Sequence, residues 1–509
     1  MNNTIEFDDI QALVRFGHGH LVDASFLLLD IVDATQAKHW LTNAPVSSAE
    51  IAEDIPERAL QIAFTMEGLQ ALGLEQEQVE GFSEEFYTGM SGDNSRSRRL
   101  GDIAQNDPKG WSWGGNSQPQ SHVLLMLYAK SGQLDIFRHE LEDNSFKQGF
   151  RLNQQLNTID TGGIEPFGFT DGISQPEIDW ERSVTTDFHS REDYSNRLAL
   201  GEILLGYPNE YGEYTKRPLI SPVSSKKTSL PRAEDYPEME DLGRNGSYLV
   251  VRQLHQDVPG FWQYMDQQVS GDPQQREELA SKMVGRRRDG TPLISDEHPI
   301  ASNQLSAGAA NEFDYDGDPH GYQCPIGAHI RRSNPRTGDF PADVQGFFSR
   351  LVRILGFGRK YPGDDLVAST RFHRLLRRGR PYGEPISPSD ALKSGALNSE
   401  RGLQFICLAA NISRQFEFVQ NAWAIGPKFS GLQNEGDPLL GHRQPLGSGE
   451  ATDHFTQPNA QGPTHCSKGL PPFITVRGGG YFFLPGIRAL RYIADANTSS
   501  SDYTASGGD

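Results

Sequence analysis

Residues 122–141 read HVLLMLYAKSGQLDIFRHEL, and this stretch decides the fold class. In its first half, alternating Leu and Tyr side chains within an apolar run give the two-residue period of a strand. After a Ser-Gly turn, Leu134, Phe137 and Leu141 recur every three or four residues, which is the period of one helix face. The stretch therefore predicts a buried strand, a turn and an amphipathic helix.

Three further segments show the same strand, turn and helix pattern without repeating the sequence. They are SFLLLDIVDATQAKHWL from Ser25, SYLVVRQLHQDVPGFWQYM from Ser247 and LQFICLAANISRQFEFVQNAW from Leu403. Two of the four segments lie in each half of the chain, which predicts two related α+β domains. The stretch 208–244 is rich in Pro, Ser and charged residues, so we expect the connection there and place the domains at 1–230 and 231–509.

The composition indicates a folded, globular protein that does not bind nucleic acid. Hydrophobic residues make up 36% of the 509 positions and aromatic residues 10%, which is enough for a sizeable core. The net charge of −20 repels phosphate backbones and anionic membranes. Three scattered cysteines do not predict a disulfide framework or a zinc site. The N-terminus lacks the layout of a signal peptide and no apolar stretch is long enough to span a membrane, so we expect a cytoplasmic protein.

The segment GFTDGISQP, residues 168–176, carries the first candidate site residue. Its glycines allow tight turns and let a flat ligand approach the main chain closely. Asp171 projects from this loop near Phe169 and Ile173, and such apolar neighbours are expected to raise the pKa of its carboxyl and suit it to proton transfer. Taken alone, Asp171-Gly172 is also typical of a simple hairpin turn.

The segment CPIGAHIRRSNPR, residues 324–336, carries the second. A histidine between small and apolar neighbours, as His329 is, can be desolvated so that a neutral imidazole nitrogen is free for a metal. Arg331, Arg332 and Arg336 follow within seven residues and supply cations for the carboxylates of an anionic ligand. Haem needs both an axial base and partners for its propionates. A core histidine beside a solvated basic strip fits the same residues.

The segment RFHRLLRRGRPYG, residues 371–383, has five arginines in its first ten positions, in a chain of net negative charge. If 371–378 is helical, His373 and Arg377 share one face, and the following Gly and Pro end the helix beside Arg377. An arginine fixed at such a place can stabilise negative charge that develops on an oxygen. A solvated basic face is the alternative interpretation.

Together, the three motifs resemble those of the dye-decolourising peroxidases, and most closely the long-chain class of that family. The resemblance runs from DIQALVRFGHGHL near the N-terminus to GGGYFFLPGIRAL near the C-terminus, and its strongest marks are GFTDGISQP, AHIRRSNPR, RLLRRGRPYG and RQFEFVQNAW, in the family's order. It implies an α+β fold of two ferredoxin-like domains, each an antiparallel sheet with packed helices. It also implies one haem b, held mainly by the C-terminal domain, with the GFTDG loop carried by the N-terminal domain.

The resemblance assigns roles to individual residues. Asp171 corresponds to the distal acid–base, Arg377 to the distal arginine, and His329 to the axial ligand of the iron. The neighbouring Arg378 is the alternative for the arginine. The further residues expected to contact the cofactor are Ile173, Ser174, Arg331, Leu403, Phe405 and Asn411.

Two features depart from the family pattern. Where the family often has an acidic partner for the axial histidine, this sequence reads Asn411-Ile412-Ser413, which predicts a neutral partner and less electron density on the iron. An insertion at roughly 339–367, between the second and third motifs, is expected to cover or narrow the route to the haem. A second long irregular stretch, 427–472, is expected to be either functional or mobile.

The resemblance implies a peroxidase that reduces hydrogen peroxide to water and oxidises dyes, phenols or other one-electron donors, with Mn(II) as a further candidate donor. Tyr382 and Trp423 resemble positions that relay electrons to bulky substrates at the surface. Three alternatives remain: a haem carrier without peroxide turnover, which has no use for Asp171; an iron site whose ligand is the thiolate of Cys324; and a protein without a cofactor. The sequence leaves the oligomeric state open, as well as the choice of propionate partners among the arginines after His329.

Overall fold

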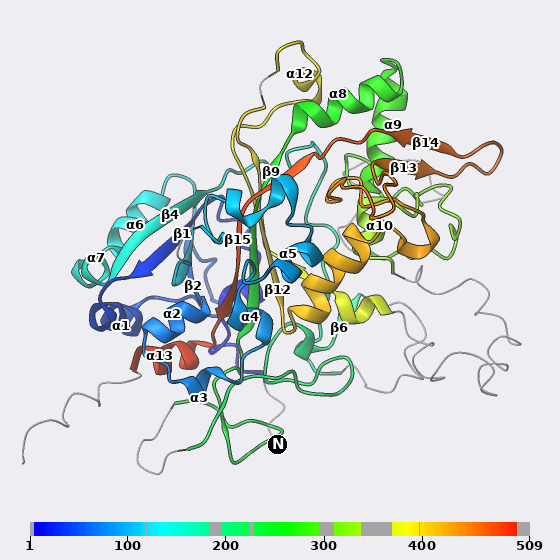
Figure 1. Ribbon diagram of the computed structural model, residues 1–509. Coiled ribbons are helices and arrows are strands. Elements are labelled where there is room, and N and C mark those ends of the chain that lie inside the picture. Colours follow the sequence, from blue (N-terminus) through cyan, green and yellow to red (C-terminus); the bar gives the residue numbers. More distant parts are fainter. Residues whose placement is uncertain are drawn as a thin grey trace, which may run out of the picture.

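A computed structural model describes residues 5–117, 120–183, 196–222, 229–294, 310–336, 369–396 and 398–495. Within these ranges, nine strands form one antiparallel sheet in the order β10-β12-β9-β15-β2-β3-β1-β4, with β11 also paired to β12 (Figure 1). The strands are β1 Asp23–Ile31, β2 Arg58–Phe64, β3 Val123–Ala129, β4 Phe150–Asn157, β9 Ser247–Gln256, β10 Leu376–Arg377, β11 Arg380–Tyr382, β12 Gly402–Ala409 and β15 Ile474–Leu484.

Helices pack on this sheet, and short strand pairs lie outside it. The helices are α1 Ala34–Asn43, α2 Met66–Ala71, α3 Gln76–Val79, α4 Glu84–Thr88, α5 Asn94–Leu100, α6 Leu134–Leu141, α7 Asn144–Gly149, α8 Val258–Gln268, α9 Pro273–Val284, α10 His329–Ser333, α12 Pro388–Ala391 and α13 Ile487–Asp495. The short pairs are β5 Glu177–Ile178 with β6 Arg197–Leu198, β7 Leu219–Ile220 with β8 Glu240–Asp241, and β13 His454–Gln457 with β14 His465–Lys468.

The long sheet consists of two units with the same topology. In the N-terminal unit the chain runs β1-α1-β2-β3-α6-β4, and the strands lie in the order β4-β1-β3-β2. In the C-terminal unit β9, β10 with β11, β12 and β15 follow one another in the chain and lie in the order β10-β12-β9-β15. Each unit is therefore an antiparallel ferredoxin-like sheet, and the predicted fold class is confirmed.

The predicted strand and helix segments form for the reasons that their patterns indicate. All seven residues of β3 are buried, as its apolar run requires. The helix after β1 begins where the Asp33 carboxylate accepts hydrogen bonds from the backbone N–H groups of Thr35 and Gln36, at 2.9 and 3.0 Å. The fourth segment differs from the prediction, because β12 is followed by two π-helical pieces, η8 Ser413–Glu417 and η9 Val419–Ile425. Such wide turns occur often beside functional sites.

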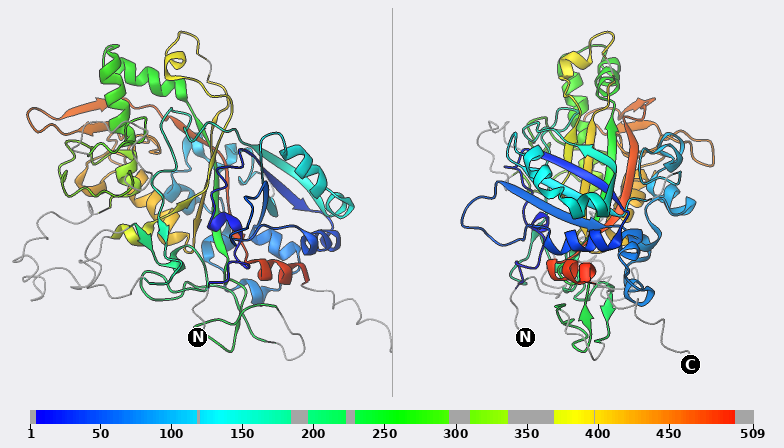
Figure 2. Two further views of the ribbon diagram at one scale, coloured as in Figure 1. Left: turned by 180° about the vertical axis from the view of Figure 1, so that it is seen from behind. Right: turned by 90° about the vertical axis from the view of Figure 1, so that its left-hand side faces the viewer.

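The two units are joined side by side through β2 and β15, which pair at Phe64 and Phe483. The last helix, α13, then returns to the N-terminal unit and packs against α1 (Figure 2). The C-terminal segment thus contributes to both units, and the division of the chain at residue 230 stays a prediction.

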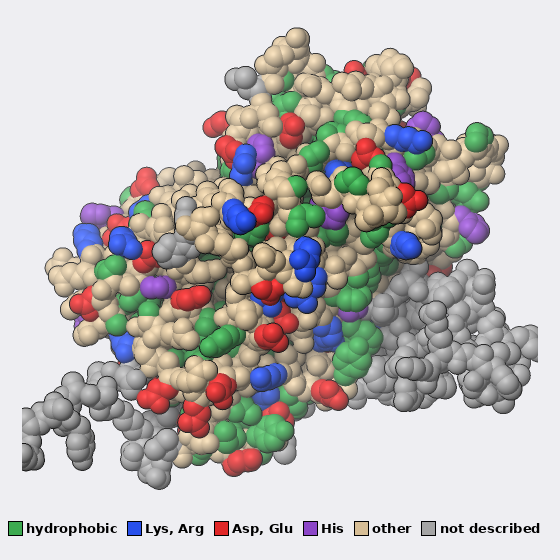
Figure 3. Space-filling model, in the orientation of Figure 1, with side chains coloured by type: hydrophobic (Ala, Val, Ile, Leu, Met, Phe, Trp, Pro, Cys, Tyr) green, Lys and Arg blue, Asp and Glu red, His purple; other side chains and the backbone are tan. Residues whose placement is uncertain are grey.

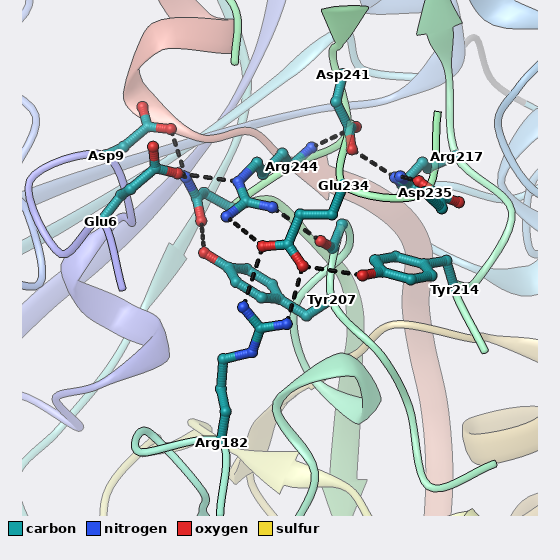
Figure 4. A network of polar contacts seen from close by, with 12 residues as sticks. Glu6, Asp9, Arg182, Tyr207, Tyr214, Arg217, Glu234, Asp235, Asp241 and Arg244 are labelled. Carbon is teal, nitrogen blue, oxygen red and sulfur yellow. Dashed lines mark hydrogen bonds and ion pairs between the residues drawn. The ribbon is translucent and has the colours of Figure 1, made fainter. Parts of the chain in front are cut away.

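A buried polar network connects the N-terminal segment to the stretch between the units (Figure 4). The Arg244 guanidinium forms ion pairs with Glu6 and Glu234, both at 3.0 Å, and lies 4.5 Å from the centre of the Tyr207 ring. Arg217 pairs with Asp241 at 2.6 Å in the same network. Because these groups are largely removed from water, each charge depends on its partner.

We expect Arg244→Ala to lower the free energy of unfolding by about 3 kcal/mol, because it removes a buried guanidinium from two ion pairs, those with Glu6 and Glu234. Urea unfolding followed by circular dichroism measures the change. Arg232→Ala is the matched control, since Arg232 is exposed and its guanidinium bonds to a backbone carbonyl; it should change the stability by less than about 0.5 kcal/mol. Equal effects of the two substitutions would contradict the role given to the network.

Acidic and basic side chains are interspersed over the face shown in Figure 3, and several acidic ones gather at its lower end. That face shows no continuous basic strip of the kind that tracks a phosphate backbone. Among the helices of the described ranges, none combines the length and apolar character needed to cross a membrane. The cytoplasmic location stays a prediction.

Candidate active site

A cavity of about 230 Å³ lies against one face of the C-terminal half of the sheet. β9, β12 and β15 contribute Leu254, Leu403 and Ile474 to its wall, and most of its lining is apolar. Its charged or titratable lining residues are Glu165, Asp171, Arg286, His329, Arg374 and Arg377. The cavity therefore brings together the key residues of all three motifs, which lie far apart in the sequence.

Asp171 reaches the cavity from a loop whose two tight turns need glycine. Gly168 and Gly172 have φ angles of +99° and +82°, a region that side chains other than glycine rarely adopt. The Asp171 N–H donates to the carbonyl of Gly163 at 2.9 Å, and the N–H of Thr170 donates to that of Arg288 at 2.9 Å. Asp171 is thus fixed by backbone contacts on both sides of the loop.

The carboxylate of Glu165 holds the start of the same loop. It accepts hydrogen bonds from the N–H groups of Phe167 and Phe169, both at 3.0 Å, and from the side-chain amide of Gln256 at 2.9 Å. Burial raises the pKa of Glu165 to about 7, against the effect of these hydrogen bonds. Glu165 did not stand out in the sequence, although it lies only three residues before the first motif.

Arg377 lies on β10 and its guanidinium donates to the Asp171 carboxylate at 2.9 Å. The side-chain amide of Gln175 fixes the backbone of Arg377, because it accepts from the Arg377 N–H at 3.0 Å and donates to the Arg377 carbonyl at 3.2 Å. Arg378 instead donates to the carbonyls of Leu13 and Val14. Arg377, and not Arg378, therefore faces the cavity.

The segment around Arg377 is not the helix that its spacing suggested. A short 3₁₀ turn covers Ser369–His373, and Leu376–Arg377 is a strand paired with β12. The expected shared face of His373 and Arg377 is therefore wrong. His373 stacks on Phe418 instead, with ring centres 3.7 Å apart.

The pKa of Asp171 moves in the direction opposite to our expectation. Burial raises it, but the positive charge of Arg377 and the hydrogen bond from the Gly172 N–H outweigh burial and hold the pKa below its ordinary value. The Asp171 side chain is 39% accessible because it borders the cavity. It is therefore an ionised base that a molecule in the cavity can reach.

His329 is the first residue of α10, and its Nδ1 lies 2.9 Å from Oδ2 of Asp437. Asp437 is fully buried, and its other oxygen accepts from the N–H groups of Leu439 and Leu440. The predicted neutral partner is wrong: the partner is a carboxylate from the irregular stretch 427–472. Such a bond fixes the ring orientation and leaves Nε2 as the free nitrogen.

Burial lowers the pKa of His329, but Asp437 outweighs it and the net pKa is raised. Asp171 and His329 both line the cavity, and each affects the pKa of the other. Asn411 does not line the cavity, and its side chain accepts from the N–H of Arg414 at 2.8 Å. The contact of Asn411 with the cofactor therefore stays a prediction, without support from the cavity wall.

The three arginines that follow His329 bind to other groups of the protein. Arg331 pairs with Asp318 at 3.2 Å, and Arg332 and Arg336 donate to backbone carbonyls. None of the three is among the residues that line the cavity, and the contact of Arg331 with the cofactor stays a prediction. The cations on the cavity wall, besides Arg377, are Arg286 and Arg374.

Arg286 is buried without a carboxylate partner among the described residues. Its guanidinium donates to the carbonyls of Gly290 and Ala310, at 2.8 and 2.9 Å, and to the hydroxyl of Ser174 at 3.0 Å. Burial lowers its pKa to about 10. A buried guanidinium on a cavity wall is a suitable partner for the carboxylate of a ligand.

The remaining predicted residues fall into two groups. Ile173, Ser174, Leu403 and Phe405 line the cavity, as expected for cofactor contacts. The two residues expected at surface relay positions, Tyr382 and Trp423, are buried, with 8% of each exposed. The expected surface location is thus wrong for both, and their relay role stays a prediction. The insertion 339–367 lies outside the described residues.

The cavity residues fit a haem group. One free imidazole nitrogen could bind the iron, the lining is largely apolar, and the buried Arg286 has no carboxylate partner among the described residues. Cys324 does not line the cavity, and burial raises the pKa of its thiol to about 12. The structure therefore favours histidine over cysteine as the ligand.

The comparisons with known proteins agree with this site. No protein-family model matches the sequence. The chain is 28% identical to a multifunctional dye peroxidase of Amycolatopsis over 76% of its length and 74% of that protein, and 26% identical to a dye-decolourising peroxidase of Exidia glandulosa over 96% and 87%. A solved structure of a dye-decolourising peroxidase with 2,6-dimethoxyphenol has 25% identity and a TM-score of 0.69, covering 96% of this chain and all of that one.

Relatives that share this name match the chain over most of their lengths, and solved structures of the same kind share its fold. The class defined by fold and site is therefore that of the haem peroxidases. Within that class, the chain is similar to the dye-decolourising peroxidases, and most of all to their long-chain form.

Proposed function

We propose that this chain binds one haem b through His329 and uses Asp171 and Arg377 to cleave hydrogen peroxide while it oxidises dyes or phenols. The ion pair of Asp171 and Arg377 on the wall of the His329 cavity is the observation that carries the proposal. Haem, when bound through His329, would supply the redox chemistry that peroxide reduction requires.

The distal residues provide a base and a cation at the same place. The ionised Asp171 carboxylate takes the proton from one peroxide oxygen and delivers it to the other, which leaves as water. The Arg377 guanidinium donates a hydrogen bond to the oxygen on which negative charge develops. Both side chains are held by the loop and the Gln175 amide, so little rearrangement is needed during the reaction.

His329 and Arg286 would bind and orient the cofactor. The Asp437 carboxylate accepts the Nδ1 proton of His329 and directs Nε2 into the cavity. Arg286 and Arg374 are the proposed partners of the propionates, because both line the cavity. Ile173, Leu403 and Phe405 supply apolar contact for a flat ring.

The proposal is tested by purifying the protein from haem-supplemented cells, recording its optical spectrum and adding one equivalent of hydrogen peroxide. A histidine-ligated ferric spectrum that converts within the mixing time supports it. A haem spectrum that does not change when peroxide is added would favour a haem carrier instead. A folded protein that takes up no haem would contradict the proposal altogether.

The reductant is proposed at the level of dyes and phenols. Mn(II) stays a prediction: in the described ranges no three His, Cys, Asp or Glu side chains are grouped closely enough to hold an ion. The oligomeric state stays open.

Replacing Asp437, the carboxylate that bonds to His329, should weaken the binding of the iron by the imidazole. We expect Asp437→Asn to lower haem affinity or the rate of the peroxide reaction by about 10–100-fold and to raise the reduction potential of the iron, since an amide withdraws less of the imidazole proton. Spectroelectrochemical titration measures the potential. Glu450→Gln, an exposed acid on the same irregular stretch, is the control. An unchanged potential in Asp437→Asn would contradict the assigned role.

A further inference from the structure

Tyr481 on β15 lies directly behind the aromatic wall of the cavity. Phe416 lines the cavity, and its ring packs edge-on against Tyr481 with the ring centres 6.2 Å apart. Only 2% of Tyr481 is exposed. One aromatic ring therefore separates a phenol, which no outside molecule can reach, from the space in which the cofactor binds.

The Tyr481 hydroxyl donates a hydrogen bond to Glu417 at 2.9 Å. The Glu417 side chain is 6% exposed and forms ion pairs with Arg96 at 2.9 Å and with Arg99 at 3.7 Å. Arg99 is 47% exposed, so the carboxylate is linked to the protein surface. Tyr481 thus has a base in hydrogen-bond contact.

A second tyrosine of the described residues, Tyr214, also donates to a carboxylate. Its partner Glu234 lies at 2.9 Å in the polar network between the two units, and neither residue lines the cavity (Figure 4). Tyr248, on the neighbouring β9, is equally buried, but its hydroxyl accepts from the N–H of Ser83 at 2.9 Å. Tyr481 alone among these three tyrosines has both a carboxylate acceptor and a position beside the cavity wall.

The acid–base state of the pair suits a coupled loss of an electron and a proton. Burial and the nearby Glu417 charge raise the pKa of Tyr481 well above its ordinary value, so the phenol is neutral at neutral pH. A neutral phenol that loses an electron becomes a strong acid and must pass its proton to a base within hydrogen-bond reach. Burial raises the pKa of Glu417 as well, which makes its carboxylate a better proton acceptor than an exposed one.

We propose that Tyr481 is a redox-active residue of this peroxidase, which gives one electron to the peroxide-oxidised cofactor while its phenolic proton moves to Glu417. The O–H bond of Tyr481 breaks, Glu417 becomes a neutral carboxylic acid, and the cofactor is reduced by one electron. The product is a neutral tyrosyl radical. An outside donor then returns one electron and Glu417 returns the proton, which restores both side chains.

This inference rests on the proposed function, because the peroxide reaction supplies the oxidant. The experiment is rapid freezing of the haem-loaded protein after one equivalent of hydrogen peroxide, without a reductant, followed by electron paramagnetic resonance. The protein is prepared with tyrosine and with 3,5-difluorotyrosine at position 481, a near-isosteric change that keeps the hydroxyl. We expect a tyrosyl signal that acquires fluorine splitting in the second protein.

Two substitutions test the parts of the pair. Tyr481→Phe should remove this signal, whereas Tyr248→Phe, which also removes one buried hydroxyl, should retain it. Glu417→Gln keeps a hydrogen-bond acceptor but cannot take the proton, so the yield of the neutral radical should fall. Thermal unfolding of each variant shows that the chain is folded.

The optical spectrum of the same samples separates two kinds of failure. If peroxide converts the haem spectrum but the radical shows no fluorine splitting, or persists in Tyr481→Phe, the redox role of Tyr481 is overturned and the proposed function stands. If peroxide leaves the haem spectrum unchanged, both are overturned.

Discussion

Asp171→Asn is expected to slow the reaction of the haem-loaded protein with hydrogen peroxide by about 10²–10⁴-fold, while haem stays bound. The amide keeps the size of the side chain and can still accept the Arg377 hydrogen bond seen at 2.9 Å. It cannot take the peroxide proton, and that step is the one assigned to Asp171. Stopped-flow absorbance at several peroxide concentrations measures the rate.

The matched control is Asp160→Asn, because Asp160 is exposed on the approach to the same loop and its carboxylate accepts from the N–H of Gly162 at 3.0 Å. It should leave the rate within about twofold of the wild type. If Asp171→Asn also retained the full rate with haem bound, the carboxylate would not be the base, and a carrier function would gain support.

Arg377→Ala is expected to slow the same reaction by about 10²–10³-fold, since it removes the cation that faces the developing negative charge. It has a second expected effect, on the pH dependence. Arg377 holds the pKa of Asp171 below its ordinary value, so its removal raises that pKa. The activity needs the ionised carboxylate, so the rate should be lost at a higher pH in the variant as the solution is acidified.

Arg378→Ala separates this effect from a general loss of basic charge. Arg378 donates to the carbonyls of Leu13 and Val14, so its removal should lower stability without the same shift of the acid limb. If the acid limb of the pH–rate profile moved equally in both variants, or in neither, the coupling of Arg377 to Asp171 would be contradicted.

The proposed site residues that the sequence brought to the cavity are those whose position depends on a short motif. Asp171 is set by its own glycine turns, and His329 lies at the start of a helix only five residues long. The strand and helix units were also predictable, because their burial follows a local period, as in the fully buried β3.

The residues that the sequence missed depend on contacts between distant segments. Asp437 lies 108 residues from His329, and its only local sign is a long irregular stretch. Arg331 is close to His329 in sequence, but its guanidinium pairs with Asp318, and neither residue lines the cavity. Arg286 lines the cavity and is the residue that we propose as a propionate partner instead.

The helix predicted over 371–378 failed for a related reason. The spacing of its arginines matches a helix face, but Arg377 pairs with Cys407 of β12 and its backbone bonds to the Gln175 amide. Tertiary hydrogen bonds outweigh local propensity here. The raised pKa expected for Asp171 failed because an apolar sequence neighbourhood does not reveal the cation that lies beside the carboxyl.

The loop that carries Asp171 follows β4 of the N-terminal unit, yet Glu165 on that loop bonds to Gln256 on β9 of the C-terminal unit. The proposed haem site is therefore complete only when both units are folded and packed against each other. A cofactor that binds only the assembled form stabilises it by about 4 kcal/mol when the free cofactor concentration is a thousand times the dissociation constant. The supply of haem would then control how much protein accumulates. Chains made when haem is scarce would lack this stabilisation and unfold more often, so a protease would degrade them faster than the haem-loaded enzyme.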